Sequence, residues 1–172
     1  MKTLFLLRHC EAYQFEEDTS DHDKQLNENG KKSAELLNNW LNKSNIIIDY
    51  VLVSSAVRTL TTANIIFSNM ESKMHEKKEL YLCGYKEIIK EVGLLDNSFN
   101  NVMVIGHEPS ISESLKFLIS YCRPDLNYVT NSLYPTGGLS ILNLSIENWQ
   151  QIEEKTAILD AFVTPDYLKK NE

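Results

Sequence analysis

Arginine is scarce in this chain, which carries three arginines, Arg8, Arg58 and Arg123, against fourteen lysines. The formal net charge is −7. An acidic surface repels nucleic acid and anionic lipid, so we expect neither a nucleic-acid partner nor a membrane partner. An acidic protein that binds an anion must instead gather its few positive groups in one place. The positions of the arginines are therefore the most informative feature of the sequence.

Cysteine and long apolar runs are also scarce. The three cysteines, Cys10, Cys83 and Cys122, show no CxxC spacing and no cluster with histidine, so we expect no metal site. An odd, unpatterned set of cysteines is typical of a reducing compartment. The first apolar run, residues 3–7, is too short for a signal peptide or a membrane span. These features together predict a cytoplasmic location.

The remaining composition is that of an ordinary globular protein, with 172 residues, 42% hydrophobic and 24% charged. Predicted strands alternate with predicted helices along the chain. The predicted strands are residues 2–7, 50–54, 102–105, 139–144 and 157–163. The predicted helices are residues 27–41, 56–70, 85–95 and 109–121. Residues 79–83 fit a short strand or an irregular segment. The alternation predicts a three-layer α/β/α fold with a mostly parallel central sheet flanked by helices.

Two arginines and two histidines directly follow predicted strands. Arg8 and His9 come after the first strand, Arg58 follows the second after a short turn, and His107 follows the third. Ligands of open α/β sheets bind at the carboxyl ends of the strands, so these four side chains are expected to converge. Guanidinium forks combined with imidazoles suit a phosphoryl group above other ligands.

Phosphoryl transfer requires an in-line nucleophile and neutralisation of the equatorial oxygens. A neutral imidazole can attack through one ring nitrogen while the other donates to a backbone carbonyl. A second imidazole, when protonated, can bind a phosphate oxygen. The amino terminus of the helix that begins near Ala56 adds free N–H groups.

Five segments carry a resemblance to the histidine phosphatase superfamily, which includes the phosphoglycerate mutases. Leu7-Arg8-His9-Cys10-Glu11 resembles its RHG motif, although Cys10 stands where the motif prefers Gly or Ala. The other four are residues 26–34 (LNENGKKSA), 54–63 (SSAVRTLTTA), 106–109 (GHEP) and 135–139 (PTGGL). The last is similar to a segment of the SixA-type phosphohistidine phosphatases. The likeness runs from residue 3 to about 168, and implies one phosphoglycerate mutase-like domain over residues 1–172.

The resemblance implies roles for the strand-end residues. His9 would be the nucleophile and carry a transient phosphohistidine, while Arg8, Arg58 and His107 would hold the phosphoryl oxygens. Thr136 and Gly137 would shape the turn beside the pocket or contact the phosphate directly. The resemblance implies no cofactor, and no metal.

The general acid is left open by the sequence. Glu79-Leu80 followed by Cys83-Gly84 resembles a segment of the SixA-type subfamily, and Glu79 is the first candidate because of this position. Glu11, Asp18 and Glu87 are the other candidates. Cys10 places a thiol beside the proposed nucleophile, and both a redox-sensitive thiol and a buried inert one are open.

The leading functional hypothesis is hydrolysis of phosphohistidine on a carrier or histidine-phosphotransfer protein, with inorganic phosphate as product. The chain has no long insertion between Arg58 and His107 to form a substrate lid, which favours an open site for a protein substrate. A small-molecule phosphomonoesterase acting on sugar or nucleotide phosphates is the alternative. A non-catalytic phosphate-binding module is disfavoured because the nucleophile is present. A monomer is expected.

Overall fold

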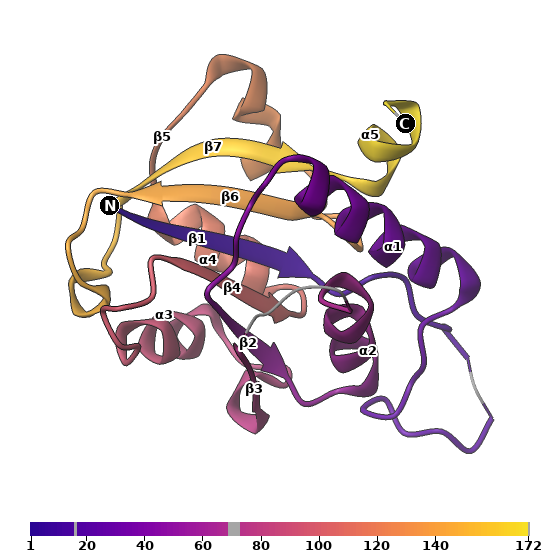
Figure 1. Ribbon diagram of the computed structural model, residues 1–172. Coiled ribbons are helices and arrows are strands. Elements are labelled where there is room, and N and C mark those ends of the chain that lie inside the picture. The colour runs from indigo at the N-terminus through magenta and orange to yellow at the C-terminus, as the bar shows by residue number, and fades with distance from the viewer. Residues whose placement is uncertain (16, 69–72, 172) are drawn as a thin grey trace.

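A seven-stranded sheet forms the centre of the molecule (Figure 1). The computed structural model describes residues 1–15, 17–68 and 73–171. The strands are β1 (Lys2–Arg8), β2 (Tyr50–Ser54), β3 (Lys73–Lys77), β4 (Asn101–Gly106), β5 (Ile119–Cys122), β6 (Leu139–Leu144) and β7 (Ala157–Val163). Their order across the sheet is β3-β2-β4-β1-β6-β7-β5. Only the pairs that β6 makes with β1 and with β7 are antiparallel, which confirms the predicted, mostly parallel sheet.

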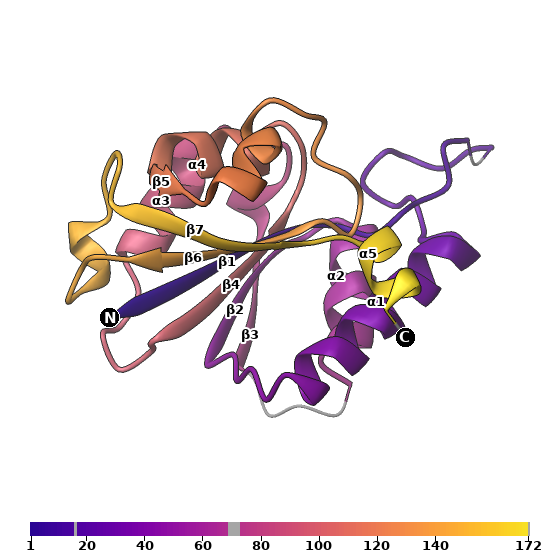
Figure 2. The ribbon, with the colours of Figure 1, turned by 90° about the horizontal axis from the view of Figure 1, so that it is seen from above.

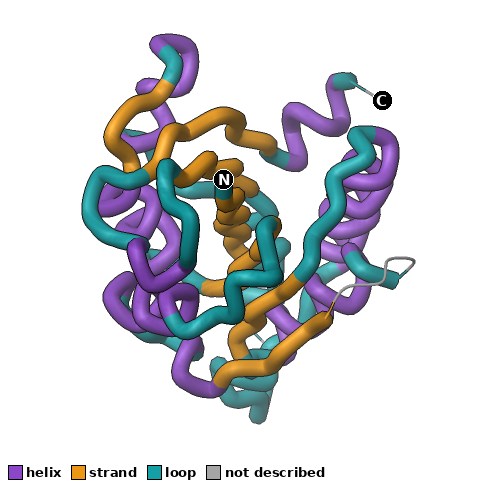
Figure 3. Tube along the Cα trace, turned by 60° about the vertical axis from the view of Figure 1, so that its left-hand side comes forward, coloured by secondary structure: helices purple, strands orange, loops and turns teal. Residues whose placement is uncertain are grey.

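Helices cover both faces of the sheet (Figures 2 and 3). They are α1 (Glu28–Lys43), α2 (Val57–Ile66), α3 (Tyr85–Gly93), α4 (Ser110–Leu118) and α5 (Pro165–Lys170), with 3₁₀ turns η1 (Lys78–Leu80), η2 (Pro124–Thr130) and η3 (Trp149–Gln151). Helices α1, α2 and α5 lie on one side and α3 and α4 on the other. None of the helices in the described ranges combines the length and apolar character needed to cross a membrane.

The central strand β1 serves both halves of the core, because successive side chains of a strand point to opposite faces. Leu4 and Leu6 pack with residues of α3 and α4, whereas Phe5 and Leu7 pack with residues of α1 and α2. All four are at most 3% exposed. The strand therefore reads as a continuous apolar run rather than an alternating one, as expected for a strand covered on both faces.

Two helices end earlier than the sequence predicts by more than two residues, and one strand was not predicted. The helix predicted to reach Tyr121 ends at Leu118, because Ile119 turns into β5, which pairs with β7. The helix predicted to reach Met70 ends at Ile66, and residues 69–70 lie outside the described ranges. The edge strand β3 carries the polar sequence KMHEK and has no apolar pattern that could predict it.

The start of α1 was predicted correctly, and it lies against the turn that follows β1. The Asn27 side chain caps the helix by accepting a hydrogen bond from the Gly30 amide at 2.8 Å. Gly30 itself packs on the backbone of Glu11, two residues after His9; a Cβ at this position would lie 2.0 Å from the Glu11 carbonyl oxygen. Only glycine allows this close approach between α1 and the turn.

We predict that Gly30→Ala lowers the free energy of unfolding by about 3 kcal/mol, because a methyl group there overlaps backbone that cannot rotate away. The matched control is Gly84→Ala, since a Cβ at Gly84 meets no atom within 4 Å. The control is expected to lose less than about 1 kcal/mol, the effect of alanine at a helix N-cap. Urea denaturation of the two variants measures the difference, and equal losses would contradict the close-approach argument.

Candidate active site

The structure brings together the four strand-end residues that the sequence singled out. Strands β1 and β4 are parallel neighbours with Arg8 opposite Gly106, so the residues that follow them, His9 and His107, lie side by side. Their ring centroids are 5.3 Å apart. Arg58, the second residue of α2, places its Nη2 3.4 Å from Nδ1 of His107. We call these four residues the strand-end cluster.

His9 is held in the form that a nucleophile needs. Its Nδ1 lies 2.7 Å from the carbonyl oxygen of Cys10, and because a carbonyl can only accept, Nδ1 carries the proton. The lone pair is then on Nε2. Burial, with a smaller contribution from the charges of Arg58 and Arg8, lowers the pKa of His9 to about 4. His9 is therefore a neutral imidazole with a free Nε2 at neutral pH.

His107 is also neutral in this structure. Its Nε2 lies 2.8 Å from Oγ of Ser54, and its Nδ1 faces Nη2 of Arg58. A guanidinium only donates, so Nδ1 is the acceptor and Nε2–H donates to the serine. Burial, the neighbouring His9 and the charge of Arg58 lower the pKa of His107 to about 3. The protonated form predicted for phosphate binding therefore requires the negative charge of a bound phosphoryl group.

The two arginines are fixed by oxygen acceptors. Nη1 of Arg8 donates to the carbonyl oxygen of Tyr134 at 2.6 Å. Nη2 of Arg58 donates to Oδ2 of Asp21 at 3.0 Å, and its Nη1 donates to the Asp21 carbonyl oxygen. The Arg58 side chain is only 7% exposed. Both positive charges are thus held at one edge of the sheet, in an environment where their attraction for an anion is weakly screened.

Asp21 and Tyr81 join the site, and the sequence-based analysis did not single out either. The Tyr81 hydroxyl donates to Oδ2 of Asp21 at 2.9 Å, and the Tyr81 ring meets the ring of His107 edge-on at 5.6 Å. The charge of Asp21 acts on the pKa values of both His9 and His107. Asp21 belongs to an acidic stretch whose other carboxylates are equivalent in sequence, so no signal distinguished it.

Glu79 is placed differently. Its side chain is exposed on η1, and the charged groups that it acts on are Lys77 and Lys90. The carboxylate that acts on both imidazoles is that of Asp21. The prediction that Glu79 is the general acid gains no support from this position.

Thr136 and Gly137 lie in the loop that supports the turn after β1. The Gly137 amide donates to the carbonyl oxygens of Arg8 and His9, at 3.1 and 3.0 Å, and Gly137 has a φ of 71°. This amide is therefore committed to the backbone of the cluster. Thr136 lines a hollow of about 380 Å³, whose other lining residues are Glu11, Asn29, Ser33, Pro135, Thr164, Pro165, Asp166 and Lys169. A direct phosphate contact stays a prediction for both residues.

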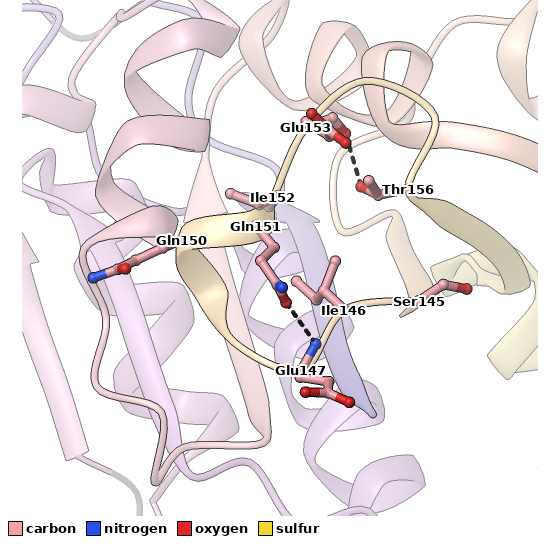
Figure 4. A pocket seen from close by; sticks show the side chains of 8 residues that line it. All are labelled: Ser145, Ile146, Glu147, Gln150, Gln151, Ile152, Glu153 and Thr156. Atoms are coloured by element: carbon pink, nitrogen blue, oxygen red, sulfur yellow. Dashed lines mark hydrogen bonds between the residues drawn. The ribbon is translucent and has the colours of Figure 1, made fainter.

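A larger hollow, of about 580 Å³, lies in the connection between β6 and β7 (Figure 4). It is lined by Ser145, Ile146, Glu147, Gln150, Gln151, Ile152, Glu153 and Thr156. Leu144 pairs with Lys2, so this connection lies at the opposite end of β1 from Arg8. The hollow has two carboxylates and no cationic side chain, which makes it unsuited to a phosphoryl group. Within the described ranges, no group of three His, Cys, Asp or Glu side chains could hold a metal ion.

Comparison with known proteins identifies the family. A model of the histidine phosphatase superfamily (branch 1) matches residues 4–85. The chain belongs to this superfamily. An uncharacterised protein of Mycobacterium leprae is 30% identical to this histidine phosphatase over 152 residues, which span 88% of this chain and 92% of that protein.

Solved histidine phosphatases share the fold. A SixA protein from Nakamurella multipartitia, described as a candidate phosphohistidine phosphatase, is 25% identical with a TM-score of 0.79, over 95% of this chain and 96% of that one. The protein histidine phosphatase SixA in complex with tungstate has a TM-score of 0.77 at 23% identity, over 96% and 99% of the two chains. The α-ribazole phosphatase of Shigella flexneri has a TM-score of 0.69 at 18% identity, over 95% and 96%.

We predict that kcat/KM falls on the acid side only when the pH approaches 4. A lowered pKa keeps His9 unprotonated as the pH falls through 6.5, the ordinary value for imidazole, and protonation removes the nucleophile only around pH 4. Measuring kcat/KM against pH with two substrates whose phosphoryl groups have different pKa values separates titration of the substrate from titration of His9. An acid limb near pH 6.5 with both substrates would contradict the assignment.

We predict that peroxide does not inactivate the protein through Cys10. This thiol is fully buried, and burial raises its pKa to about 12, so the reactive thiolate is scarce at neutral pH. The wild type and Cys10→Ala are expected to lose activity at the same rate during peroxide treatment. Marked protection in Cys10→Ala would show instead that this thiol is the redox-sensitive group.

Proposed function

We propose that this histidine phosphatase hydrolyses phosphohistidine on a carrier or histidine-phosphotransfer protein, through a phosphohistidine formed on His9. The observation that carries the proposal is the state of His9: a neutral imidazole with Nδ1–H tied to the Cys10 carbonyl, in contact with His107 and close enough to Arg58 and Arg8 for their charges to lower its pKa. An imidazole in this state can attack phosphorus through Nε2.

The first step transfers the phosphoryl group to His9. Its Nε2 attacks phosphorus, and the bond from phosphorus to the substrate nitrogen breaks, with the electron pair passing to that nitrogen. The substrate ring leaves as neutral imidazole because its other nitrogen already carries a proton. The Nδ1 proton of His9 is retained throughout, and the Cys10 carbonyl that accepts from it stabilises the positive ring of the phosphorylated His9.

The second step regenerates the enzyme. Water attacks phosphorus, the bond to Nε2 of His9 breaks and the electron pair returns to Nε2. Inorganic phosphate leaves as the monoanion, which keeps both protons of the water, and His9 is again neutral. Arg8 and Arg58 face the charge on the equatorial oxygens in both steps, and the negative phosphoryl group favours a protonated His107 that donates to a third oxygen.

The leaving group favours phosphohistidine over an ester. An alkoxide needs a general acid, whereas a protonated phosphoimidazole does not. Asp21 is the carboxylate whose charge acts on both imidazoles. Hydrogen bonds from Tyr81 and Arg58 lower its pKa to about 2, so it has no proton to give at neutral pH. The absence of a lid insertion between Arg58 and His107, where the described chain forms α2, β3, η1, α3 and β4, also suits a protein substrate.

A small-molecule phosphomonoesterase is the second candidate function. The likeness to the α-ribazole phosphatase favours it, since that protein has the same fold over nearly the whole chain. Comparing phosphate release from a phosphohistidine-bearing carrier protein and from p-nitrophenyl phosphate, with and without a chelator, separates the two. We expect fast release from the carrier protein, unchanged by the chelator. Faster release from the ester would favour the second candidate.

We predict that His9→Ala lowers turnover by on the order of 10³-fold or more, because it removes the attacking nitrogen. The matched control is His75→Ala, since His75 is exposed on the edge strand β3 and stacks on Tyr50. The control is expected to keep full activity. A radiolabelled phosphoryl group should be trapped on the wild type and on the control, but not on His9→Ala. Full hydrolysis by His9→Ala would overturn the assignment of the nucleophile.

A further inference from the structure

The Asp21 carboxylate lies beside the strand-end cluster, in contact with Arg58. Its Oδ2 accepts from Arg58 at 3.0 Å and from Tyr81 at 2.9 Å, and its Oδ1 lies 3.2 Å from Nζ of Lys24. The Asp21 side chain is nevertheless 50% exposed, whereas its partner Arg58 is 7% exposed. Asp21 is thus attached to the phosphoryl-binding arginine on one side and faces solvent on the other.

The segment around Asp21 is fixed to the site by several contacts. The His22 carbonyl oxygen accepts from the amide of Val57, the first residue of α2. The His22 ring lies 3.0 Å from Oγ of Ser55 through Nε2 and meets the Tyr81 ring edge-on at 4.8 Å. These contacts join the acidic stretch after β1 to the turn after β2 and to the segment after η1. The position of the carboxylate is therefore set by the tertiary structure.

A fixed negative charge beside a phosphoryl site discriminates between substrates. Arg8 and Arg58 attract the phosphoryl oxygens of every substrate, whereas Asp21 repels them. A protonated phosphohistidine brings a positive ring attached to phosphorus, and this ring is attracted to the carboxylate. A phosphate ester brings no positive charge, so for an ester only the repulsion is left.

We propose that Asp21 determines the specificity of this site by selecting phosphoryl groups bound to a cationic leaving group, of which protonated phosphohistidine is the biological example. The inference deepens the proposed function and rests on it for the identity of that substrate. Because Asp21 stays ionised through the physiological pH range, its contribution to selectivity is electrostatic rather than proton transfer. Even when it is screened as strongly as in bulk water, one unit charge about 4 Å away changes relative rates by about 5-fold, and weaker screening enlarges the effect.

Phosphoramidate and p-nitrophenyl phosphate are suitable small probes. The nitrogen of phosphoramidate is protonated at neutral pH; when Nε2 of His9 attacks phosphorus and the P–N bond breaks, the electron pair stays on nitrogen, which leaves as neutral ammonia. The nitrophenyl ester has the same phosphoryl group but carries no positive charge; when its P–O bond breaks, the electron pair stays on oxygen, which leaves as the stable nitrophenolate anion. Neither probe makes protein–protein contacts, and their other differences are the same for both enzymes. The change in their ratio between the wild type and a variant at Asp21 therefore reports the charge of the leaving group.

The test substitutes Asp21→Asn, which keeps one oxygen to accept from Arg58 and Tyr81, removes the charge and gives up the ion pair with Lys24. The matched control is Glu17→Gln, which removes the same charge from an exposed residue of the same acidic stretch. We expect Asp21→Asn to lower the ratio of kcat/KM for phosphoramidate to that for the nitrophenyl ester about 5–10-fold. We also expect inorganic phosphate to inhibit the Asp21→Asn variant more tightly, while Glu17→Gln matches the wild type in both measurements.

Opposite results would overturn the inference. If Asp21 only positions Arg58, Asp21→Asn slows both probes equally and weakens inhibition by phosphate. If Glu17→Gln shifts the ratio as much as Asp21→Asn, the effect belongs to overall charge and not to Asp21. The proposed function fails separately, when the wild type does not release phosphate from a phosphohistidine-bearing protein. The probe ratio and the phosphate inhibition still decide the role of Asp21 in that case.

Discussion

Parallel pairing of β1 with β4 is the constraint on which the site depends. The register places Arg8 opposite Gly106, so the next residue of each strand is a histidine and the two rings lie 5.3 Å apart. Both strands are buried on both faces, which fixes their register, since a slip would move apolar side chains of one core half toward the other. The stability of the double core and the geometry of the two imidazoles therefore have the same origin.

Burial then sets the chemistry of the cluster. Removing His9 and His107 from water lowers the pKa values of both rings, so the site without a ligand holds two neutral imidazoles beside two permanently charged guanidiniums. The Asp21 carboxylate balances part of this charge through its ion pair with Arg58, and an incoming anion balances the rest. An acidic protein with three arginines thus concentrates positive charge at one edge of its sheet. The single negative charge of Asp21 lies beside it and, as we propose, selects for the group that is attached to the anion.

The prediction from sequence succeeded where the pattern was local and failed where partners were distant. The apolar runs gave β1, β2 and β4, and the N-cap Asn27 gave the start of α1. The polar edge strand β3 was missed because it is held by pairing with β2 rather than by its own composition. Among the site residues, the strand-end positions of His9 and His107 were readable, whereas the role of Asp21 was not, since neighbouring aspartates look the same in sequence.

The sequence by itself determined the family, the class of fold and the four residues of the strand-end cluster, because strand ends and short motifs are local features that survive without knowledge of packing. Only the tertiary structure decided which carboxylate lies beside the cluster, which tautomer His9 adopts and how far burial lowers its pKa. Each of these depends on groups that are distant in sequence, such as Asp21 and Arg58, and on the exclusion of water by the folded core. Electrostatic interactions are set by distance and solvent exposure, which the order of residues does not contain.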